Sequence, residues 1–268
     1  MSEFITSNEG FIRLGVFFSV FCLVAFCEGL FPKRARLFPR GQRWGANIGV
    51  LLIGGLCVRV FMPWVPVSVA YYVSVENAAL MNISASTELV NTLLGVVILD
   101  LAIYMQHRAM HKIPILWRLH RMHHCDLECD VTTGIRFHPL EIIISIFYKI
   151  VVIFIFGIDV LAVIIFEILL NAMAMFNHAN LKLPFGVDRM VRLFIVTPDM
   201  HRVHHSVLSQ ETNSNYGFFL SCWDRAFQSY TSQPMMGHDK MTIGLADFKG
   251  KSCLKLWSML KIPFKGKA

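Results

Sequence analysis

The chain has 268 residues, of which 55% are hydrophobic and only 16% are charged, and its mean hydropathy is +0.53. This composition excludes an ordinary soluble protein, because several stretches reach the roughly 20 apolar residues that cross the hydrocarbon of a bilayer. The formal net charge is +7, and the basic residues lie beside the apolar stretches, which indicates contact with anionic lipid rather than with nucleic acid.

The apolar stretches predict an all-α fold, a multi-span transmembrane helical bundle. Spans are expected over 11–31 and 46–64, and a third starts near Leu89 and leads into the first histidines. Residues 65–87 contain no Lys or Arg and are expected to form a loop. The loop between the first two spans is strongly basic and carries Lys33, Arg34, Arg36, Arg40 and Arg43. By the positive-inside rule this basic loop faces the cytosol, while the N-terminus and the loop over 65–87 face outside.

A further apolar region, 142–176, is interrupted at Gly157 and predicts a membrane hairpin. Each arm has about 15–17 apolar residues, so the hairpin either crosses tightly or re-enters. Residues 180–268 contain no convincing span and many Lys and Arg, which predicts a cytosolic, histidine-rich helical cap. The expected organisation is N-terminal spans and loops over 1–89, a catalytic region over 90–230 that includes the hairpin, and a basic cytosolic tail over 231–268.

Ten of the eleven histidines lie between His107 and His205. Eight of them form three short patterns, and because residues three and four apart share a helix face, each pattern aims two or three imidazoles in one direction. Thr197 followed by Pro198 predicts a helix N-terminus just before the last pattern. The patterns are His107-x-x-x-His111, His120-x-x-His123-His124 and His201-x-x-His204-His205, with His138 and His178 standing singly between them.

This many imidazoles predicts a metal centre. Neutral imidazole suits iron, zinc, copper and nickel, and eight to ten imidazoles exceed the four ligands of a structural zinc. The seven cysteines are scattered without a Cys-x-x-Cys pair, which argues against a disulfide framework and against thiolate ligands. Two metal ions in a shell of nitrogen ligands fit the count.

Acidic and polar residues accompany the histidines. Asp100 and Tyr104 precede the first pattern at spacings that place them on the same helix face. They either orient imidazoles or form a polar stripe that lines water. Glu141, Glu167 and Asn171 could reach the site, or could serve in capping and interhelical hydrogen bonds.

In order and spacing, these residues resemble the fatty acid hydroxylase / sterol desaturase superfamily, over roughly 90–230. The resemblance is carried by six segments, in which the flanking residues match as well as the histidines. They are Asp100-x-x-x-Tyr104-x-x-His107-Arg108-x-x-His111, His120-Arg-x-His123-His124, Arg136-Phe137-His138-Pro139-x-Glu141, Asn177-His178-Ala179-Asn180, His201-Arg-Val-His204-His205-Ser206, and Asn215-Tyr216-Gly217 with Trp223-Asp224-Arg225.

The resemblance implies an integral-membrane, non-haem di-iron oxidoreductase that uses O2 to hydroxylate or desaturate a C–H bond of a fatty acyl, sterol or related lipid. It implies that the two irons are held by His107, His111, His120, His123, His124, His178, His201, His204 and His205. His138 is either a further ligand or a neighbour that supports one. Asp100, Tyr104, Glu141 and Asn177 are predicted as further catalytic residues, and Asn177 stands where many family members have a second polar or histidine residue.

The electrons are expected from a separate protein of the ferredoxin or cytochrome b5 type. The chain has neither a cysteine-rich cluster motif nor a dinucleotide-binding Gly-x-Gly-x-x-Gly, and a basic cap would dock an acidic partner. Two alternatives stay open: a zinc-dependent membrane hydrolase and a non-catalytic metal-binding membrane protein. A multi-pass protein with its active site on the cytosolic side is expected, with a bacterial inner membrane favoured.

Overall fold

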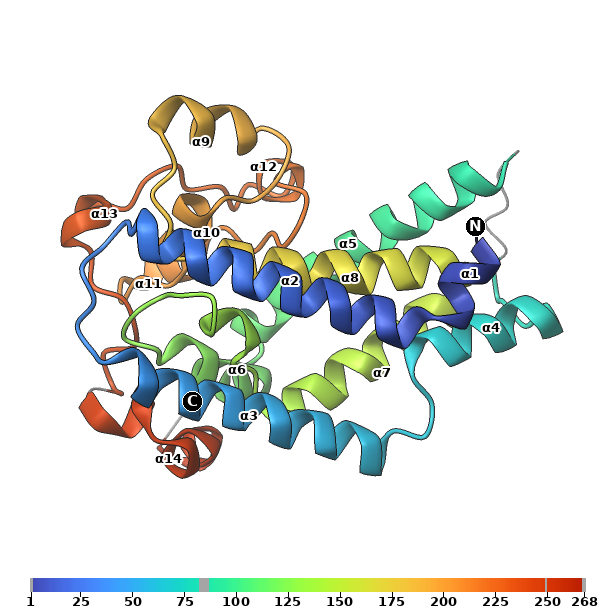
Figure 1. Cartoon of the computed structure of the whole chain (residues 1–268), viewed down its shortest axis with the longest axis horizontal. Helices are drawn as coiled ribbons and strands as arrows, with labels where there is room; N and C mark the ends of the chain where they lie inside the picture. Colours follow the sequence, from blue (N-terminus) through green and yellow to red (C-terminus); the bar gives the residue numbers. More distant parts are fainter. Residues whose placement is uncertain (1, 82–86, 249, 267–268) are drawn as a thin grey trace.

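The computed structural model describes residues 2–81, 87–248 and 250–266 (Figure 1). Within these ranges, five helical segments are long and apolar enough to cross a membrane. They are α2 (Glu9–Leu30), α3 (Arg40–Phe61) continued by α4 (Pro66–Glu76), α5 (Glu88–Lys112), α7 (Pro139–Phe156) and α8 (Val160–Asn177). The short helix α1 (Ser2–Ser7) precedes α2. The prediction of an all-α bundle with several candidate spans is confirmed.

Helix α4 lies where a loop was expected. Pro66 is its first residue, a position at which the missing proline N–H costs nothing. The hydroxyl of Ser68 accepts a hydrogen bond from the Val65 N–H at 3.1 Å and caps this end. Val69 and Val73 are buried against the hairpin, so packing stabilises the helix. The rest of the expected loop includes residues 82–86, which lie outside the described residues.

Helices α7 and α8 form the hairpin that the sequence predicts. Gly157 ends α7 with φ of 65°, in the left-handed region that glycine adopts without strain. Asp159 then caps α8 by accepting a hydrogen bond from the Ala162 N–H at 2.8 Å. Each arm has 18 residues, about 27 Å of helix, because the arms begin and end slightly beyond the apolar stretch.

Helix α5 packs directly against this hairpin. A Cβ at Gly95 would lie 2.7 Å from the Ala162 Cβ, so only glycine allows the two helices to approach this closely. Leu99, Ile103 and Phe166 are buried in the core between α5, α7 and α8. The packing fixes the end of α5 that carries His107 and His111.

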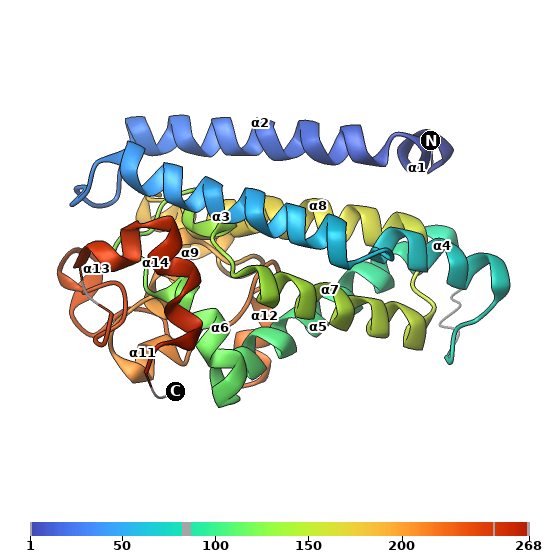
Figure 2. The same cartoon turned by 90° about the horizontal axis from the view of Figure 1, so that it is seen from below.

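Short helices cover one end of the bundle (Figures 1 and 2). We call this part, residues 113–138 and 178–266, the cap. The region expected as a basic tail folds back onto α3 and the first cap helix, because Met259 and Ile262 share a buried cluster with Val50 and Met122. The cap elements are α6 (Pro114–His124), η1 (Thr133–Ile135), α9 (Phe185–Val191), α10 (Pro198–His204), α11 (Ser209–Thr212), α12 (Cys222–Ala226), α13 (Gly237–Lys240), η2 (Gly250–Leu254), α14 (Leu256–Leu260) and η3 (Ile262–Phe264).

The basic loop between α2 and α3 docks onto the cap. Lys33 pairs with Asp199 at 2.8 Å, and Arg34 donates hydrogen bonds to cap carbonyls. Arg43 is 1% exposed and pairs with Asp126 at 2.9 Å and with Asp130. The expectation that the basic residues face lipid is therefore wrong for Arg43. The contacts place the basic loop and the cap on the same side of the bundle.

Candidate metal centre

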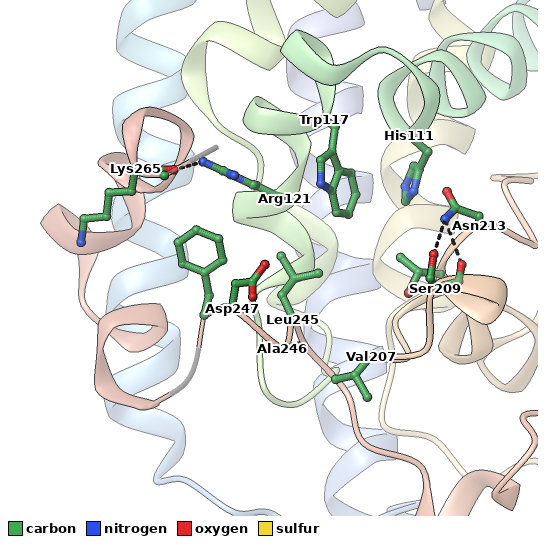
Figure 3. A pocket seen from close by; sticks show the side chains of 13 residues that line it. His111, Trp117, Arg121, Val207, Ser209, Asn213, Leu245, Ala246, Asp247 and Lys265 are labelled. Carbon is green, nitrogen blue, oxygen red and sulfur yellow. Dashed lines mark hydrogen bonds between the residues drawn. The ribbon is translucent and has the colours of Figure 1, made fainter. Parts of the chain in front are cut away.

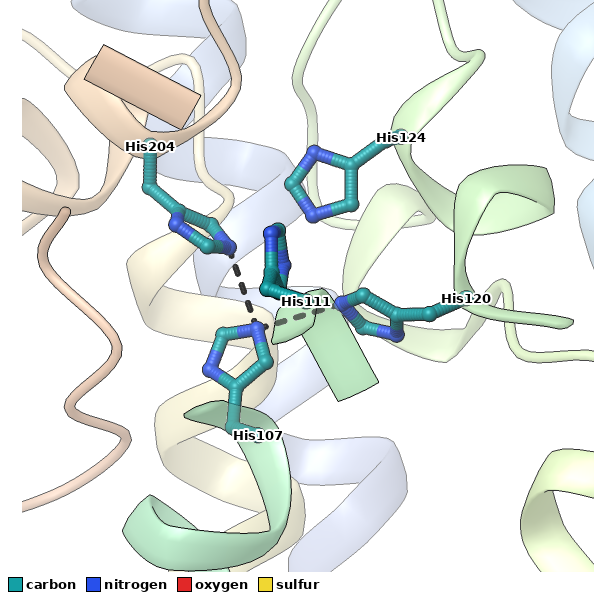
Figure 4. A group of neighbouring side chains, drawn as sticks. All are labelled: His107, His111, His120, His124 and His204. Carbon is teal, nitrogen blue, oxygen red and sulfur yellow. Dashed lines mark hydrogen bonds between the residues drawn. The ribbon is translucent and has the colours of Figure 1, made fainter. Parts of the chain in front are cut away.

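Nine histidines meet at the base of the cap in two adjoining groups. In each group, one ring nitrogen of every member lies within 4.8 Å of the corresponding nitrogens of the others. The five-histidine group comprises His107, His111, His120, His124 and His204 (Figure 4). The four-histidine group comprises His123, His178, His201 and His205. The groups adjoin where the His124 and His205 rings stack with centroids 4.5 Å apart.

Helix geometry divides the two His-x-x-His-His motifs between the groups. Residues four apart are offset by about 40° around an α-helix, whereas adjacent residues are offset by about 100°. In α6, His120 and His124 therefore join one group while His123 joins the other. At α10, His201 and His205 likewise join the four-histidine group, while His204 joins the five-histidine group. In both motifs two imidazoles point the same way, in line with the expectation of two or three, and the third enters the other group.

The start of α10 is set locally. Thr197 Oγ1 accepts a hydrogen bond from the Met200 N–H at 3.3 Å, and Pro198 is the first helical residue. The predicted helix start is thus confirmed. It places the first turn of α10 so that its histidines face the ends of α5, α6 and α8.

Backbone carbonyls determine the tautomers of several rings. A carbonyl oxygen only accepts, so a ring nitrogen that it contacts carries the proton, and the other nitrogen of a neutral ring carries a lone pair. Four Nδ1 atoms have such partners at 2.6–3.2 Å: His107 with Tyr216, His204 with Ser214, His178 with Ala174 and His123 with Arg136. Their Nε2 atoms are therefore unprotonated and point into the two groups.

These lone pairs face one another at short distance. His107 Nε2 lies 3.1 Å from His120 Nε2 and 3.0 Å from His204 Nε2. The His178 and His123 Nε2 atoms face each other at 3.0 Å, and His201 Nε2, whose Nδ1 has no partner among the described residues, lies 3.1 Å from His178 Nε2. Facing lone pairs repel unless a cation lies between them. Metal–nitrogen bonds of about 2.1 Å at right angles would place neighbouring ligands about 3.0 Å apart, so the spacing fits a metal ion in each group.

Further ring nitrogens in the groups lack hydrogen-bond partners. His111, His124 and His205 each have two buried nitrogens with no partner among the described residues. A buried polar atom without a partner costs about 1–3 kcal/mol, and three rings in one place would be strongly destabilising. Metal coordination would satisfy one nitrogen of each ring.

The cap imidazoles are held neutral, as metal ligands must be. Burial lowers the pKa of the His178 ring to about 4 and that of the His204 ring to about 3. Burial, together with the neighbouring imidazoles, also holds the pKa values of His123, His201 and His205 well below their usual range. Protons therefore do not compete for the lone pairs at neutral pH.

Glu141 makes a direct contact with one of these rings. It lies in the first turn of α7 and is 6% exposed. Its Oε1 is 2.6 Å from His120 Nδ1, so the ring donates this hydrogen to the carboxylate and directs Nε2 into the five-histidine group. Carboxylates in this position orient metal-binding histidines and raise their basicity.

Asp100, Tyr104 and Asn177 contact the segment 216–229 rather than an imidazole nitrogen. Asp100 accepts hydrogen bonds from the Trp223 indole at 2.8 Å and from a backbone N–H. The Tyr104 hydroxyl bonds to a serine hydroxyl at 2.7 Å, and the Asn177 amide donates to the Phe218 carbonyl at 2.6 Å. Since this segment provides the carbonyl that orients His107, the three residues support the site indirectly.

His138 and Glu167 are held elsewhere. His138 Nδ1 accepts a hydrogen bond from the Leu140 N–H at 3.2 Å and caps α7, and its Nε2 faces the Leu260 carbonyl at 3.3 Å. Within the described ranges, His138 belongs to neither histidine group. Glu167 forms ion pairs with Lys149 and Arg13 between helices.

Arg136 is a supporting residue whose role the sequence reading missed. It is completely buried, and its guanidinium donates hydrogen bonds to the Met122 carbonyl, to Asn47 and to the Cys253 carbonyl. Its own carbonyl orients His123. The available signal was the acidic run over 126–130, because buried carboxylates require cationic partners, and Arg136 lies 3.9 Å from Asp126.

A cavity of about 740 Å³ opens beside the five-histidine group (Figure 3). It is lined by His111, Trp117 and Arg121, by residues around α11, and by the segment over 245–248. Among the nine grouped histidines, His111 is the one that is not fully buried. The Trp117 ring lies 4.8 Å from the His111 ring and 5.4 Å from the His124 ring. The cavity therefore leads to one histidine group and not to the other.

Comparison with known proteins agrees with this geometry. The fatty acid hydroxylase family model matches residues 92–229, which carry all nine histidines. The chain belongs to the fatty acid hydroxylase family. An ornithine lipid hydroxylase of Rhizobium tropici is 29% identical over 141 residues, 53% of this chain and 42% of that protein. Alkylglycerol monooxygenases of Homo sapiens and Danio rerio are 26% and 30% identical, over 54% and 60% of this chain.

The similarity to these relatives is partial. The matched region spans 31% of the human protein and 33% of the Danio rerio protein, so the chain covers less than half the length of the curated relatives that it matches. No solved structure matches the chain.

Proposed function

We propose that this fatty acid hydroxylase family member is an integral-membrane di-iron oxygenase that uses O2 to hydroxylate a C–H bond of a lipid. The observation that carries the proposal is the set of facing, unprotonated Nε2 atoms 3.0–3.1 Å apart in two adjoining groups. Iron is the metal proposed because the ligands are imidazoles, which suit iron, and because the matched relatives are named as a hydroxylase and monooxygenases.

In this proposal each histidine group holds one iron, and His138 is not a ligand. Bound iron would supply the O2 activation and the oxidising power for C–H cleavage. The chain's own residues bind and orient: Glu141 and the backbone carbonyls keep the ring protons on Nδ1, and Arg136 fixes the loop behind His123. The apolar core of α5, α7 and α8 excludes water from the site.

A membrane lipid is the proposed substrate class. The relatives are named for ornithine lipids and alkylglycerols, both of which combine an apolar chain with a polar end. The cavity beside His111 has both kinds of lining, with Trp117, Leu245 and Phe248 alongside Ser209 and Asn213. We propose that the polar part of the lipid occupies this cavity and that the site faces the cytosol. A separate ferredoxin or cytochrome b5 type protein would supply the electrons there.

Metal analysis of the purified protein tests the function. We expect about two irons per chain in the wild type, O2 consumption with a reductant and lipid extract, and a hydroxylated lipid product by mass spectrometry. The double variant His204→Ala, His205→Ala removes one ligand from each group and should lose both iron and O2 consumption.

The chain offers matched controls for this experiment. His138→Ala and His238→Ala each remove a buried histidine outside the two groups, and both should retain the iron. Stoichiometric zinc, with no O2 consumption after iron and reductant are added, would favour the zinc hydrolase. If no metal binds under any loading condition, the proposal fails.

A further inference from the structure

The segment over 184–195 exposes an unusual amount of apolar surface for a cap element. It includes α9, and the exposed fractions are 74% for Phe185, 62% for Met190, 58% for Leu193 and 69% for Phe194. These residues belong to one short stretch, and its helix α9 lies at the edge of the cap (Figure 1). Contiguous apolar surface of this kind marks contact with another molecule or with a membrane.

Two of the three charged residues of the same segment, Asp188 and Arg192, point inward, and the third, Arg189, is exposed. Asp188 and Arg192 are 5% and 6% exposed and form an ion pair. Asp188 also accepts a hydrogen bond from the Thr197 hydroxyl at 2.6 Å, and Arg192 donates to the Ser232 carbonyl at 2.9 Å. A surface helix in water has the opposite arrangement, with its charges outside and its apolar face inside. The inverted arrangement suits an apolar surrounding.

A neighbouring segment places this apolar surface at membrane depth. The backbone of 194–196 is hydrogen-bonded to that of 219–221. The backbone N–H of Leu220, within 219–221, donates a hydrogen bond to Asp100, and so does the indole of Trp223, two residues beyond it. Asp100 lies at the middle of the spanning helix α5 (Glu88–Lys112), twelve residues or about 18 Å along the axis from either end. The hydrocarbon of a bilayer is about 30 Å thick.

The beginning of the segment lies at the membrane surface. The Lys182 N–H donates to the Phe31 carbonyl at 2.8 Å, directly after the end of α2. Lys182 and Arg189 are exposed, and their long side chains can place their charges among lipid phosphates. The chain thus enters at the surface, descends along α9 and returns to α10.

We propose that residues 184–195 are immersed in the bilayer leaflet on the cap side, where Phe185, Met190, Leu193 and Phe194 contact lipid acyl chains. The segment does not span the membrane, because it enters the leaflet from the cap side and returns to the cap. The proposal differs in this region from the expectation that residues 180–268 form a cytosolic cap. The proposal is independent of the metal and of the reaction.

Spin labelling in lipid nanodiscs tests the immersion. Labels at Leu193→Cys and Phe194→Cys should be more accessible to O2, which concentrates in hydrocarbon, than to a water-soluble nickel chelate. Asp239→Cys is the control, since it is exposed on α13 at the far end of the cap (Figure 2). Its label should show the reverse preference. The background replaces Cys22, Cys27, Cys57 and Cys222 with alanine, and the other cysteines are buried.

A native residue gives a second measurement that leaves the segment unaltered. Cys222 is exposed on the adjacent α12, and with only Cys22, Cys27 and Cys57 replaced its label should show the same preference for O2. Preferential nickel access at positions 193, 194 and 222 would overturn the proposal. Low access to both reagents would mean that protein covers this face, and would overturn it as well.

Discussion

The two histidine groups use the same ligand type but differ in their surroundings. The five-histidine group adjoins a cavity of about 740 Å³ through His111, which is partly exposed. Every member of the four-histidine group is buried, and that group lies against the end of α8 and the loop that Arg136 holds. The difference indicates that one group is built to be reached from outside and the other to be kept closed.

The two groups also differ in how they are oriented. The five-histidine group has a carboxylate partner, Glu141, on His120. In the four-histidine group, the partners are backbone carbonyls. His178 donates its Nδ1 hydrogen to the Ala174 carbonyl, and His123 donates to the Arg136 carbonyl. A carboxylate can be removed by substitution, whereas a carbonyl cannot, so mutations can test the groups separately.

Removing one ligand from one group should have the largest effect. His120→Ala should lower the metal content from two ions per chain to one, and His178→Ala should do the same. Iron analysis together with Mössbauer spectroscopy would show which ion remains. If the reaction needs both ions, both variants should lose activity. If either single variant lost both ions, the two groups would not be separable binding sites.

Loss of the carboxylate should have the next largest effect. Glu141→Ala should weaken metal binding by the five-histidine group by roughly 10- to 100-fold, the usual effect of removing such a partner, and leave the other group unchanged. Glu141→Gln keeps an acceptor oxygen and should retain most of the affinity. Titration of metal-free protein with Co²⁺ would measure both sites. Equal weakening at both groups would contradict the contact seen with His120.

The spans, the hairpin and the identity of the clustered histidines could be predicted from sequence, because each rests on a local signal. Apolar length predicts α2, α3 and α5, and a glycine at 157 marks the hairpin turn. The histidine spacings indicated a metal centre. The division of the two His-x-x-His-His motifs between the groups could not be predicted, because it depends on how α5, α6 and α10 cross.

Other features carry no signal in residue type. The acceptors of His107 and His204 are backbone carbonyls of Tyr216 and Ser214, and every residue has a carbonyl. Arg43 stands among basic residues that look like topology determinants, yet it forms buried ion pairs with acids more than eighty positions later. Such long-range contacts depend on the fold as a whole.

The buried imidazoles should make the metal-free protein sensitive to mild acid. The pKa of His178 is about 4 when folded and near 6.5 when unfolded, so the unfolded chain binds more protons between these values. The contribution of such a ring to the free energy of unfolding is fully present above pH 6.5. It is lost as the pH falls toward 4, by about 1.4 kcal/mol per pH unit for each ring. His178→Gln should reduce this slope when unfolding is followed between pH 7 and 5.5. A stability that does not change over this range would argue against buried neutral imidazoles.

Closing the cavity should have the smallest effect and should act on one group alone. Ala246 is exposed and lines the cavity beside Trp117, so Ala246→Trp would fill its mouth without altering a histidine or its partners. A water-soluble iron chelator should remove the wild-type metal in two phases, the faster from the five-histidine group. The variant should slow the fast phase on the order of a few-fold and leave the slow phase unchanged, because the four-histidine group does not adjoin the cavity. A single phase in the wild type, or equal slowing of both phases, would mean that the two groups are reached by one route and that the exposure of His111 does not distinguish them.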